Sequence, residues 1–255
     1  MIPMNPMTPN KIVVIIPSRY GSSRFEGKPL ALIAGRPMIQ WVYERAGRAR
    51  NITDIVVATD DQRIYDAVTG FGGRAVMTSP INRSGTDRVA EAAGILGLAP
   101  EDLVINIQGD QPLIDPECLD DLVMPFISDA PVDMSTLAYK IINKREITDP
   151  KDVKVTFNVK GDALYFSRSP IPFARDAGTR FDTYKHLGVY AYTRRFLEIF
   201  RNLPEGTLER IEKLEQLRAL EHGYSIRVVV TPYDSPEVDL PEDIQRIEAG
   251  LRAMG

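Results

Sequence analysis

The sequence predicts an α/β protein in which a mostly parallel sheet is covered by helices on both faces. Strands and helices alternate through the first half of the chain, and each strand is a short apolar run rich in β-branched residues. This repeated order favours parallel strands joined by helical crossovers. At 255 residues, the chain is long enough for one large domain of this class.

In the first half, a helix is expected after each strand. The strands are predicted at residues 11–16, 54–58, 74–77 and 103–108, and the helices at residues 38–50, 62–68, 87–98 and 116–127. Ser84 or Thr86 is available as the N-terminal cap of the third helix, because a hydroxyl there can accept a free backbone N–H.

The second half is predicted to be richer in strands. They are expected at residues 132–141, 153–158, 163–166, 187–192 and 226–230, with an irregular polar loop over residues 173–183. Leucine and isoleucine at spacings of three predict one amphipathic helix over residues 208–221, and Pro241 suits the first turn of a last helix over residues 241–254. We expect one domain over residues 11–255, with a β-rich insertion at about 132–193 and a disordered lead-in over residues 1–10.

Composition excludes several classes of protein. A net charge of -4 argues against a general nucleic-acid surface. The single cysteine, Cys118, excludes an intrachain disulfide and a cysteine zinc cluster, and its amphipathic surroundings indicate a core thiol. The sequence has no apolar run long enough to span a membrane and no signal-peptide core near Met1, so we expect a cytoplasmic protein.

The loop after the first strand, residues 17–30, has the composition of a triphosphate-binding loop. It contains two glycines, two arginines and Lys28, so backbone N–H groups can surround phosphate oxygens while the cations balance their charge. It is not a Walker A loop, because five residues separate Gly21 from Gly27 and Pro29 follows the lysine. The absence of G-x-G-x-x-G gives a nicotinamide or flavin site no support. The alternative is an ordinary loop with a solvated basic face.

Two aspartates are candidate magnesium ligands. Asp110 stands just past a buried strand, next to a glycine that permits close backbone approach. Asp239 follows the last strand. The alternatives are a turn aspartate at 110 and a helix cap at 239, and spacing alone favours the cap.

Three further segments carry groups that can bind a ligand, each with a plain structural alternative. The Ser-Gly-Thr-Asp-Arg run at residues 84–88 can hold a nucleotide, or it can simply cap a helix and end in a surface arginine. Arg168 can grip a substrate carboxylate through two hydrogen bonds. A lone histidine in a strand, such as His186, is more often structural, and a solvated helix face is the default for Glu215 and Gln216.

Taken in order, the motifs resemble those of the CMP-KDO synthetases, the 3-deoxy-manno-octulosonate cytidylyltransferases, from about Lys11 to the last helix. The matching motifs are P-S-R-Y-G-S-S-R-F-E-G-K-P-L, S-G-T-D-R, Q-G-D-Q-P, A-L-Y-F-S-R, H-L-G-V-Y, L-E-Q-L-R and V-D-L-P-E-D. Each is weak alone, and together they are highly specific. The resemblance implies a Rossmann-like three-layer α/β/α nucleotide-diphospho-sugar transferase fold, a homodimer, and a magnesium-dependent transfer of CMP from CTP to the eight-carbon acid sugar KDO. Pyrophosphate is the second product, and CMP-KDO serves lipopolysaccharide synthesis.

The resemblance also implies roles for individual residues. Catalysis would rest on Lys28, Arg19, Asp110 and Asp239, the two aspartates holding magnesium. The nucleotide would be bound by Ser18, Arg19, Gly21, Ser22, Lys28, Ser84, Thr86, Arg88 and Gln108. The sugar would be bound by Arg168, His186, Tyr190, Glu215 and Gln216.

The chain departs from the family pattern at two places. Many members have Leu-Pro where this chain has Phe25-Glu26, and glutamate where it has Gln111. Neither change removes a group that the mechanism needs. The Q-G-D-Q-P and K-H-L-G-V-Y-A-Y runs also resemble relatives that use the 8-amino analogue of KDO, so that analogue, or another acid sugar such as sialic acid, is an alternative substrate.

Overall fold

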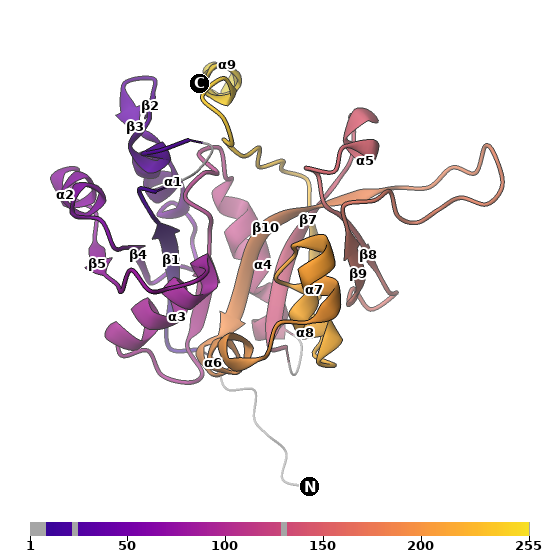
Figure 1. The fold of residues 1–255 in the computed structure, drawn as a ribbon, viewed down its shortest axis with the longest axis horizontal. Helices are drawn as coiled ribbons and strands as arrows, with labels where there is room; N and C mark the ends of the chain where they lie inside the picture. Colours follow the sequence, from indigo (N-terminus) through magenta and orange to yellow (C-terminus); the bar gives the residue numbers. More distant parts are fainter. Residues whose placement is uncertain (1–8, 22–24, 129–131, 255) are drawn as a thin grey trace, which may run out of the picture.

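The computed structural model describes residues 9–21, 25–128 and 132–254, and within them one nine-stranded sheet forms the centre (Figure 1). The predicted α/β class is confirmed. The strands of this sheet are β1 (Ile12–Ser18), β4 (Asp54–Thr59), β5 (Ala75–Met77), β6 (Leu103–Asn106), β7 (Met134–Lys140), β8 (Lys154–Phe157), β9 (Ala163–Ser167), β10 (Tyr184–Thr193) and β11 (Arg227–Thr231). A separate small pair is formed by β2 (Leu32–Ile33) and β3 (Arg36–Pro37).

The main path through the sheet runs β11-β7-β10-β6-β1-β4-β5. The strands of the first half are parallel, with β1 between β4 and β6. β10 is antiparallel to both β6 and β7. Its N-terminal end also pairs with β8, which in turn pairs with β9. The β-rich segment therefore extends the parallel sheet, and its strands form the part of the sheet that contains antiparallel pairs.

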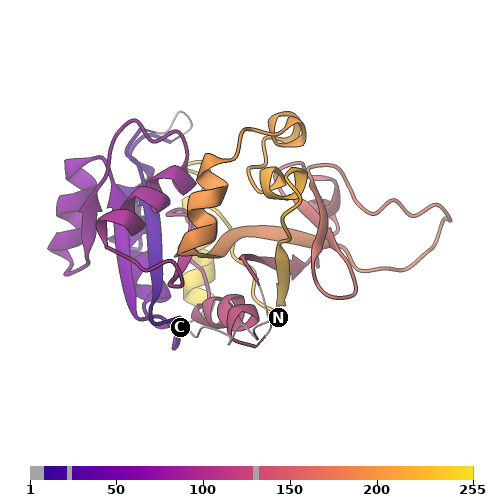
Figure 2. The ribbon, with the colours of Figure 1, turned by 90° about the horizontal axis from the view of Figure 1, so that it is seen from below.

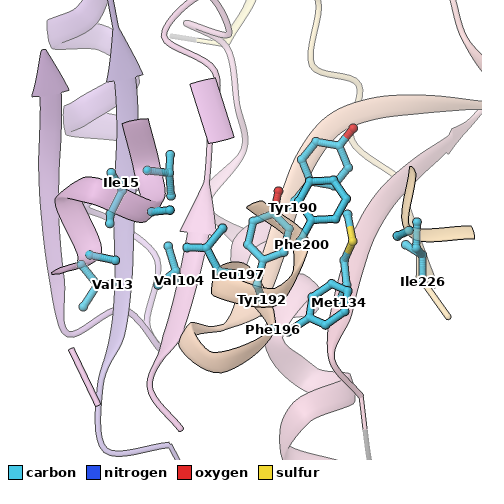
Figure 3. Close-up of a cluster of buried hydrophobic side chains, with 14 of the residues drawn as sticks. Val13, Ile15, Val104, Met134, Tyr190, Tyr192, Phe196, Leu197, Phe200 and Ile226 are labelled. Atoms are coloured by element: carbon cyan, nitrogen blue, oxygen red, sulfur yellow. The ribbon is translucent and has the colours of Figure 1, made fainter. Parts of the chain in front are cut away.

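Helices lie on both faces of the sheet. They are α1 (Met38–Ala46), α2 (Gln62–Gly70), α3 (Gly85–Ile95), α4 (Pro116–Ser128), α5 (Arg145–Thr148), α6 (Arg194–Asn202), α7 (Thr207–Glu212), α8 (Leu217–Glu221) and α9 (Asp243–Met254), with a 3-10 turn η1 (Lys28–Leu30). Alternate residues of β1 face opposite layers. Val13 and Ile15 belong to a core that also contains side chains of α3, α6 and α8, whereas Val14 and Ile16 belong to a core that contains side chains of α1, α2 and α4. Figure 3 shows the first of these cores, in which Tyr192 and Phe200 stack.

The prediction of one helix over residues 208–221 is wrong. The chain forms α7 and α8 instead, with Lys213 between them at a positive φ of 54°. A left-handed residue ends an α-helix, because the next N–H no longer points along the helix axis. The helix α6 was not expected from the sequence, and α9 begins at Asp243 where Pro241 had been predicted as its first turn.

Two irregular segments bear on the site. Residues 168–183, between β9 and β10, extend away from the rest of the chain in both views (Figure 1; Figure 2). Residues 232–242 connect β11 to α9 across the upper end of the sheet. Cys118 is buried in the core, as predicted, with its Sγ 3.3 Å from Thr231 Oγ1. Residues 1–8 of the predicted lead-in lie outside the described residues. Among the described helices, none combines the length and the apolar character needed to cross a membrane.

Candidate active site

Lys28 lies at the centre of the candidate site. Its Nζ is 2.5 Å from Asp110 Oδ2 and donates a hydrogen bond of 3.0 Å to the carbonyl of Val238. The backbone N–H of Val238 donates to the carbonyl of Asp110 at 2.9 Å. The triphosphate loop, the end of β6 and the segment before α9 therefore meet at one point, and Asp239 is the next residue along that segment.

Two glycines permit this close approach. Gly27 precedes η1 at a φ of 67°, and a Cβ there would lie 3.0 Å from the Tyr20 ring. A Cβ on Gly109 would lie 2.9 Å from Ser18 Oγ. Glycine is the residue that fits both positions, because the first needs a left-handed backbone and the second leaves no room for a side chain.

A cavity of about 280 Å³ opens beside Lys28 at the carboxyl ends of β1 and β6. Predicted nucleotide-binding residues that line it are Ser18, Arg19, Lys28, Ser84, Arg88 and Gln108, together with Asp110. Ser18 Oγ is buried and has no hydrogen-bond partner among the described residues. Gly21 is exposed, and Ser22 lies outside the described residues.

The residues at the start of α3 combine structural and site-facing contacts. Ser84 caps the helix, since its Oγ accepts the N–H of Asp87 at 3.1 Å. The Arg88 side chain is buried, and it donates to Thr78 Oγ1 at 2.6 Å and to Asp60 Oδ2 at 2.9 Å. The sequence alternative of a surface arginine at this position is therefore wrong, because the guanidinium joins the ends of neighbouring strands while it lines the cavity.

Thr86 connects the nucleotide residues to the predicted sugar residues. Its Oγ1 donates a hydrogen bond of 2.6 Å to Glu215 Oε2. Burial raises the pKa of Glu215, and the bond from Thr86 partly offsets that effect. A second cavity of about 1140 Å³ runs along this side, and Arg19, Ser84 and Glu215 line it.

Tyr190 and Gln216, the residue after Glu215, form a buried pair. Tyr190 donates its hydroxyl to Gln216 Oε1 at 3.1 Å, while Gln216 Nε2 is buried without a partner among the described residues. An unpaired buried amide is costly, so its N–H groups are candidate donors to a ligand. Tyr190 also contacts the His186 ring, with centroids 5.3 Å apart.

His186 has the contacts of a structural histidine. Its Nε2 lies 2.8 Å from Thr136 Oγ1, and its ring packs against Phe166 at 5.1 Å. Burial lowers the pKa of His186 to about 3, so the imidazole is neutral at ordinary pH. The ring can offer a hydrogen bond but carries no positive charge to a substrate carboxylate.

Arg168 points its guanidinium at the backbone. Nε donates to the carbonyl of Glu212 at 2.8 Å, Nη1 to that of Pro150 at 2.9 Å, and Nη2 to that of Lys213 at 3.5 Å. These carbonyls belong to the junction between α7 and α8 and to the turn before β8. Arg168 therefore holds the turn that presents Glu215 and Gln216.

Residues 13–227 match the family model described as Cytidylyltransferase. The chain belongs to this cytidylyltransferase family. A 3-deoxy-manno-octulosonate cytidylyltransferase of Desulfosudis oleivorans is 67% identical over 244 residues, which cover 96% of this chain and 98% of the relative. An 8-amino-3,8-dideoxy-manno-octulosonate cytidylyltransferase of Shewanella piezotolerans is 57% identical over 241 residues, covering 94% and 98% of the two chains. The solved structure of a CMP:2-keto-3-deoxy-manno-octonic acid synthetase complexed with CTP superposes with a TM-score of 0.91 at 42% identity, covering 96% of this chain and 100% of the other.

Sequence reasoning missed one acidic residue of this cytidylyltransferase, Glu237. Its pKa is raised to about 8, first by burial among protein atoms and then by the nearby carboxylates of Asp110 and Asp239. These two aspartates thus lie within electrostatic reach of one carboxylate. Gln111 Nε2 is 3.4 Å from Glu237 Oε1, so the unusual glutamine in Q-G-D-Q-P faces the missed glutamate. In the sequence, Glu237 is the first of the two acids in the run E-V-D before the last helix, two positions ahead of the predicted ligand Asp239.

Proposed function

We propose that this cytidylyltransferase transfers CMP from CTP to 3-deoxy-manno-octulosonate, releasing pyrophosphate and forming CMP-KDO. The observation that carries the proposal is the joining of Lys28, Asp110 and the Val238–Asp239 backbone beside a cavity lined by Arg19 and Ser84. Lys28, Arg19 and the Asp110 carboxylate thus share one cavity at the carboxyl ends of the strands, where open α/β sheets bind ligands. The 67% identity with the Desulfosudis oleivorans relative supports the choice of sugar.

In the proposed reaction, the anomeric hydroxyl of KDO attacks the α-phosphorus of CTP and pyrophosphate leaves. Negative charge develops on the leaving phosphates, so Lys28 and Arg19 stabilise it from the triphosphate loop. Lys28 is held ready by Asp110 and the Val238 carbonyl, which limits its reorganisation when the substrate binds. Gln216 and Glu215 orient the sugar from the α7–α8 side.

A magnesium ion is part of the proposal, and Asp110 and Asp239 are the residues that would hold it. Asp110 Oδ1 is buried and has no hydrogen-bond partner among the described residues, a state that a bound cation relieves. When bound, magnesium would neutralise phosphate charge and lower the pKa of the attacking hydroxyl. No group of three or more His, Cys, Asp or Glu side chains in the described ranges is placed to hold a metal, so the remaining ligands would be phosphate oxygens and water.

A homodimer and a cytoplasmic location belong to the same proposal. The extended segment between β9 and β10 carries Phe173, which is 90% exposed, and Phe181, which is 47% exposed. Exposed aromatic side chains on a projecting segment support a surface that pairs with another copy. Light scattering coupled to size-exclusion chromatography gives the molar mass, and a value near 28.5 kDa would contradict the dimer.

The 8-amino analogue is the second candidate substrate, because the Shewanella piezotolerans relative is named for it at 57% identity. The test is pyrophosphate release from CTP and magnesium with KDO, the 8-amino analogue or sialic acid in separate reactions. We expect the highest kcat/KM with KDO. Faster pyrophosphate release with the 8-amino analogue would show that this analogue, and not KDO, is the substrate. No release with any acid sugar would refute the proposed function.

A further inference from the structure

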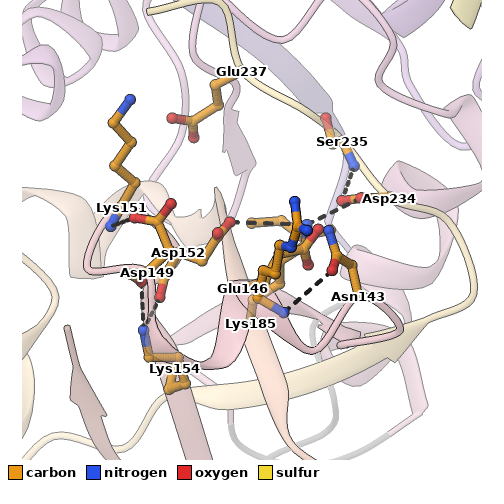
Figure 4. Close-up of polar contacts among 12 residues, drawn as sticks. Asn143, Glu146, Asp149, Lys151, Asp152, Lys154, Lys185, Asp234, Ser235 and Glu237 are labelled. Atoms are coloured by element: carbon orange, nitrogen blue, oxygen red, sulfur yellow. Dashed lines mark hydrogen bonds and ion pairs between the residues drawn. The ribbon is translucent and has the colours of Figure 1, made fainter. Parts of the chain in front are cut away.

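Lys185 of β10 lies in a cluster of charges next to the candidate active site, and the proposed reaction gives it no role. Its side chain is 8% exposed, and its Nζ lies 3.0 Å from Glu146 Oε2, 3.0 Å from Asp234 Oδ2 and 3.9 Å from Asp152 Oδ1 (Figure 4). Burial lowers the pKa of Lys185, but Asp234 and Glu146 outweigh that effect and raise it overall, so the ammonium group stays charged.

The three carboxylates come from different parts of the chain. Glu146 lies on α5, Asp152 in the turn before β8, and Asp234 in the irregular segment between β11 and α9. Without the lysine, these partly exposed negative charges would repel one another. One buried ammonium group therefore holds three separate segments together.

The segment that begins at Asp234 also carries the predicted metal ligand. Asp234 is five residues before Asp239, and no regular secondary structure fixes the chain between them. The far end of the segment is held by Val238, which is fully buried and bonded to Asp110 and Lys28. Lys185 supplies the matching attachment at the near end through Asp234.

A cavity of about 410 Å³ separates this segment from α5, and Lys185, Asp234, Glu237 and Asp239 line it. A segment that borders a cavity lacks packing on that side, so its position depends on its polar attachments. We propose that Lys185 is a positioning residue, which fixes Asp239 for metal binding by anchoring Asp234. This inference rests on the proposed function, because it assigns a role to Asp239.

The test is Mn²⁺ affinity in the presence of CTP, measured by electron paramagnetic resonance on the full chain. Asp234→Asn replaces this ion pair with a weaker contact to a neutral amide and leaves Lys185 paired with Glu146, so the fold should be kept while the Mn²⁺ dissociation constant rises about tenfold, the scale of losing a group that orients a metal ligand. Lys185→Met should give at least the same loss. The matched control is Lys140→Met, which breaks the half-exposed Lys140–Asp182 ion pair and should leave Mn²⁺ affinity unchanged.

Pyrophosphate release separates this inference from the proposed function. If wild-type protein makes CMP-KDO and binds Mn²⁺ but both variants bind Mn²⁺ as tightly as wild type, the role of Lys185 is refuted and the function stands. If wild-type protein binds no Mn²⁺ with CTP, the inference falls together with the magnesium part of the proposal. A loss of affinity in Lys140→Met as large as in Asp234→Asn would also overturn it.

Discussion

Lys28 and Asp110 are 82 residues apart in the sequence, yet Lys28 Nζ lies 2.5 Å from Asp110 Oδ2. Both side chains are mostly buried, with 15% and 21% of their surface exposed, so the pair is shielded from water. It fixes the triphosphate loop to the end of β6 before any substrate arrives. Catalysis by charge stabilisation depends on such prior arrangement, because groups already in place need no reorganisation during the reaction.

We expect Lys28→Ala to lower kcat by at least ~10²-fold, the scale of removing one electrostatic element from an active site. The change removes a cation from the leaving phosphates and leaves Asp110 without its partner. Pyrophosphate release at saturating CTP measures the effect. Arg36→Ala, which removes a surface ion pair with Glu44, is the control and should keep wild-type turnover. Turnover of Lys28→Ala within threefold of wild type would rule out the phosphate role.

Asp239→Asn tests the metal prediction at its second carboxylate. We expect the magnesium concentration for half-maximal rate to rise at least ~10-fold, because an amide oxygen is a weaker ligand than a carboxylate for a hard cation. Glu242→Gln removes an exposed acid three positions further along the chain and should change nothing. An identical magnesium dependence in Asp239→Asn and wild type would rule out Asp239 as a metal ligand.

The arrangement around β1 could be predicted from sequence because its signals are local. In three places the residue types alone predict the local geometry. These are the β-branched run that becomes β1, the glycines around Lys28 and the Gly-Asp pair after β6. Parallel strands then bring their carboxyl ends to one edge, so Lys28 and Asp110 were expected together. Glu237 stands in an acidic run, but that run does not predict its position, since the contact of Glu237 with Gln111 depends on how residues 232–242 cross the sheet.

The prediction of one helix in the α7–α8 region was wrong for a different reason. Leucines at spacings of three continue through Lys213, so the periodicity alone favours one helix. The break depends on tertiary contacts, in which Arg168 binds the carbonyls of Glu212 and Lys213. The same long-range contact directs the guanidinium of Arg168 to these backbone carbonyls. The sequence motif around Arg168 does not contain this information, and it suggested direct binding of the substrate carboxylate.

Arg168→Met should therefore act on the sugar site through the α7–α8 turn. We expect the KM for KDO to rise about 10-fold or more, in line with the loss of hydrogen bonds from a charged donor, while the KM for CTP stays within twofold of wild type. Hydrogen exchange at residues 213–218 should speed up in the variant. Weaker sugar binding with unchanged exchange there would mean that Arg168 contacts the sugar directly, as the motif suggests. Arg195→Met, an arginine variant on α6, is the control.

His186 should make stability depend on pH. Its pKa is about 3 in the folded protein, below the ordinary value of 6.5, because burial disfavours the charged ring. Between these two values the unfolded chain binds a proton that the folded chain excludes, so the free energy of unfolding falls as the pH drops below about 6.5, by at most about 1.4 kcal/mol per pH unit. His186→Gln should flatten this part of the curve from urea unfolding at pH 4.5 to 7.5, whereas the surface variant His222→Gln should keep the wild-type slope. Equal slopes in His186→Gln and wild type would show that the folded protein takes up the proton at this ring as readily as the unfolded chain does.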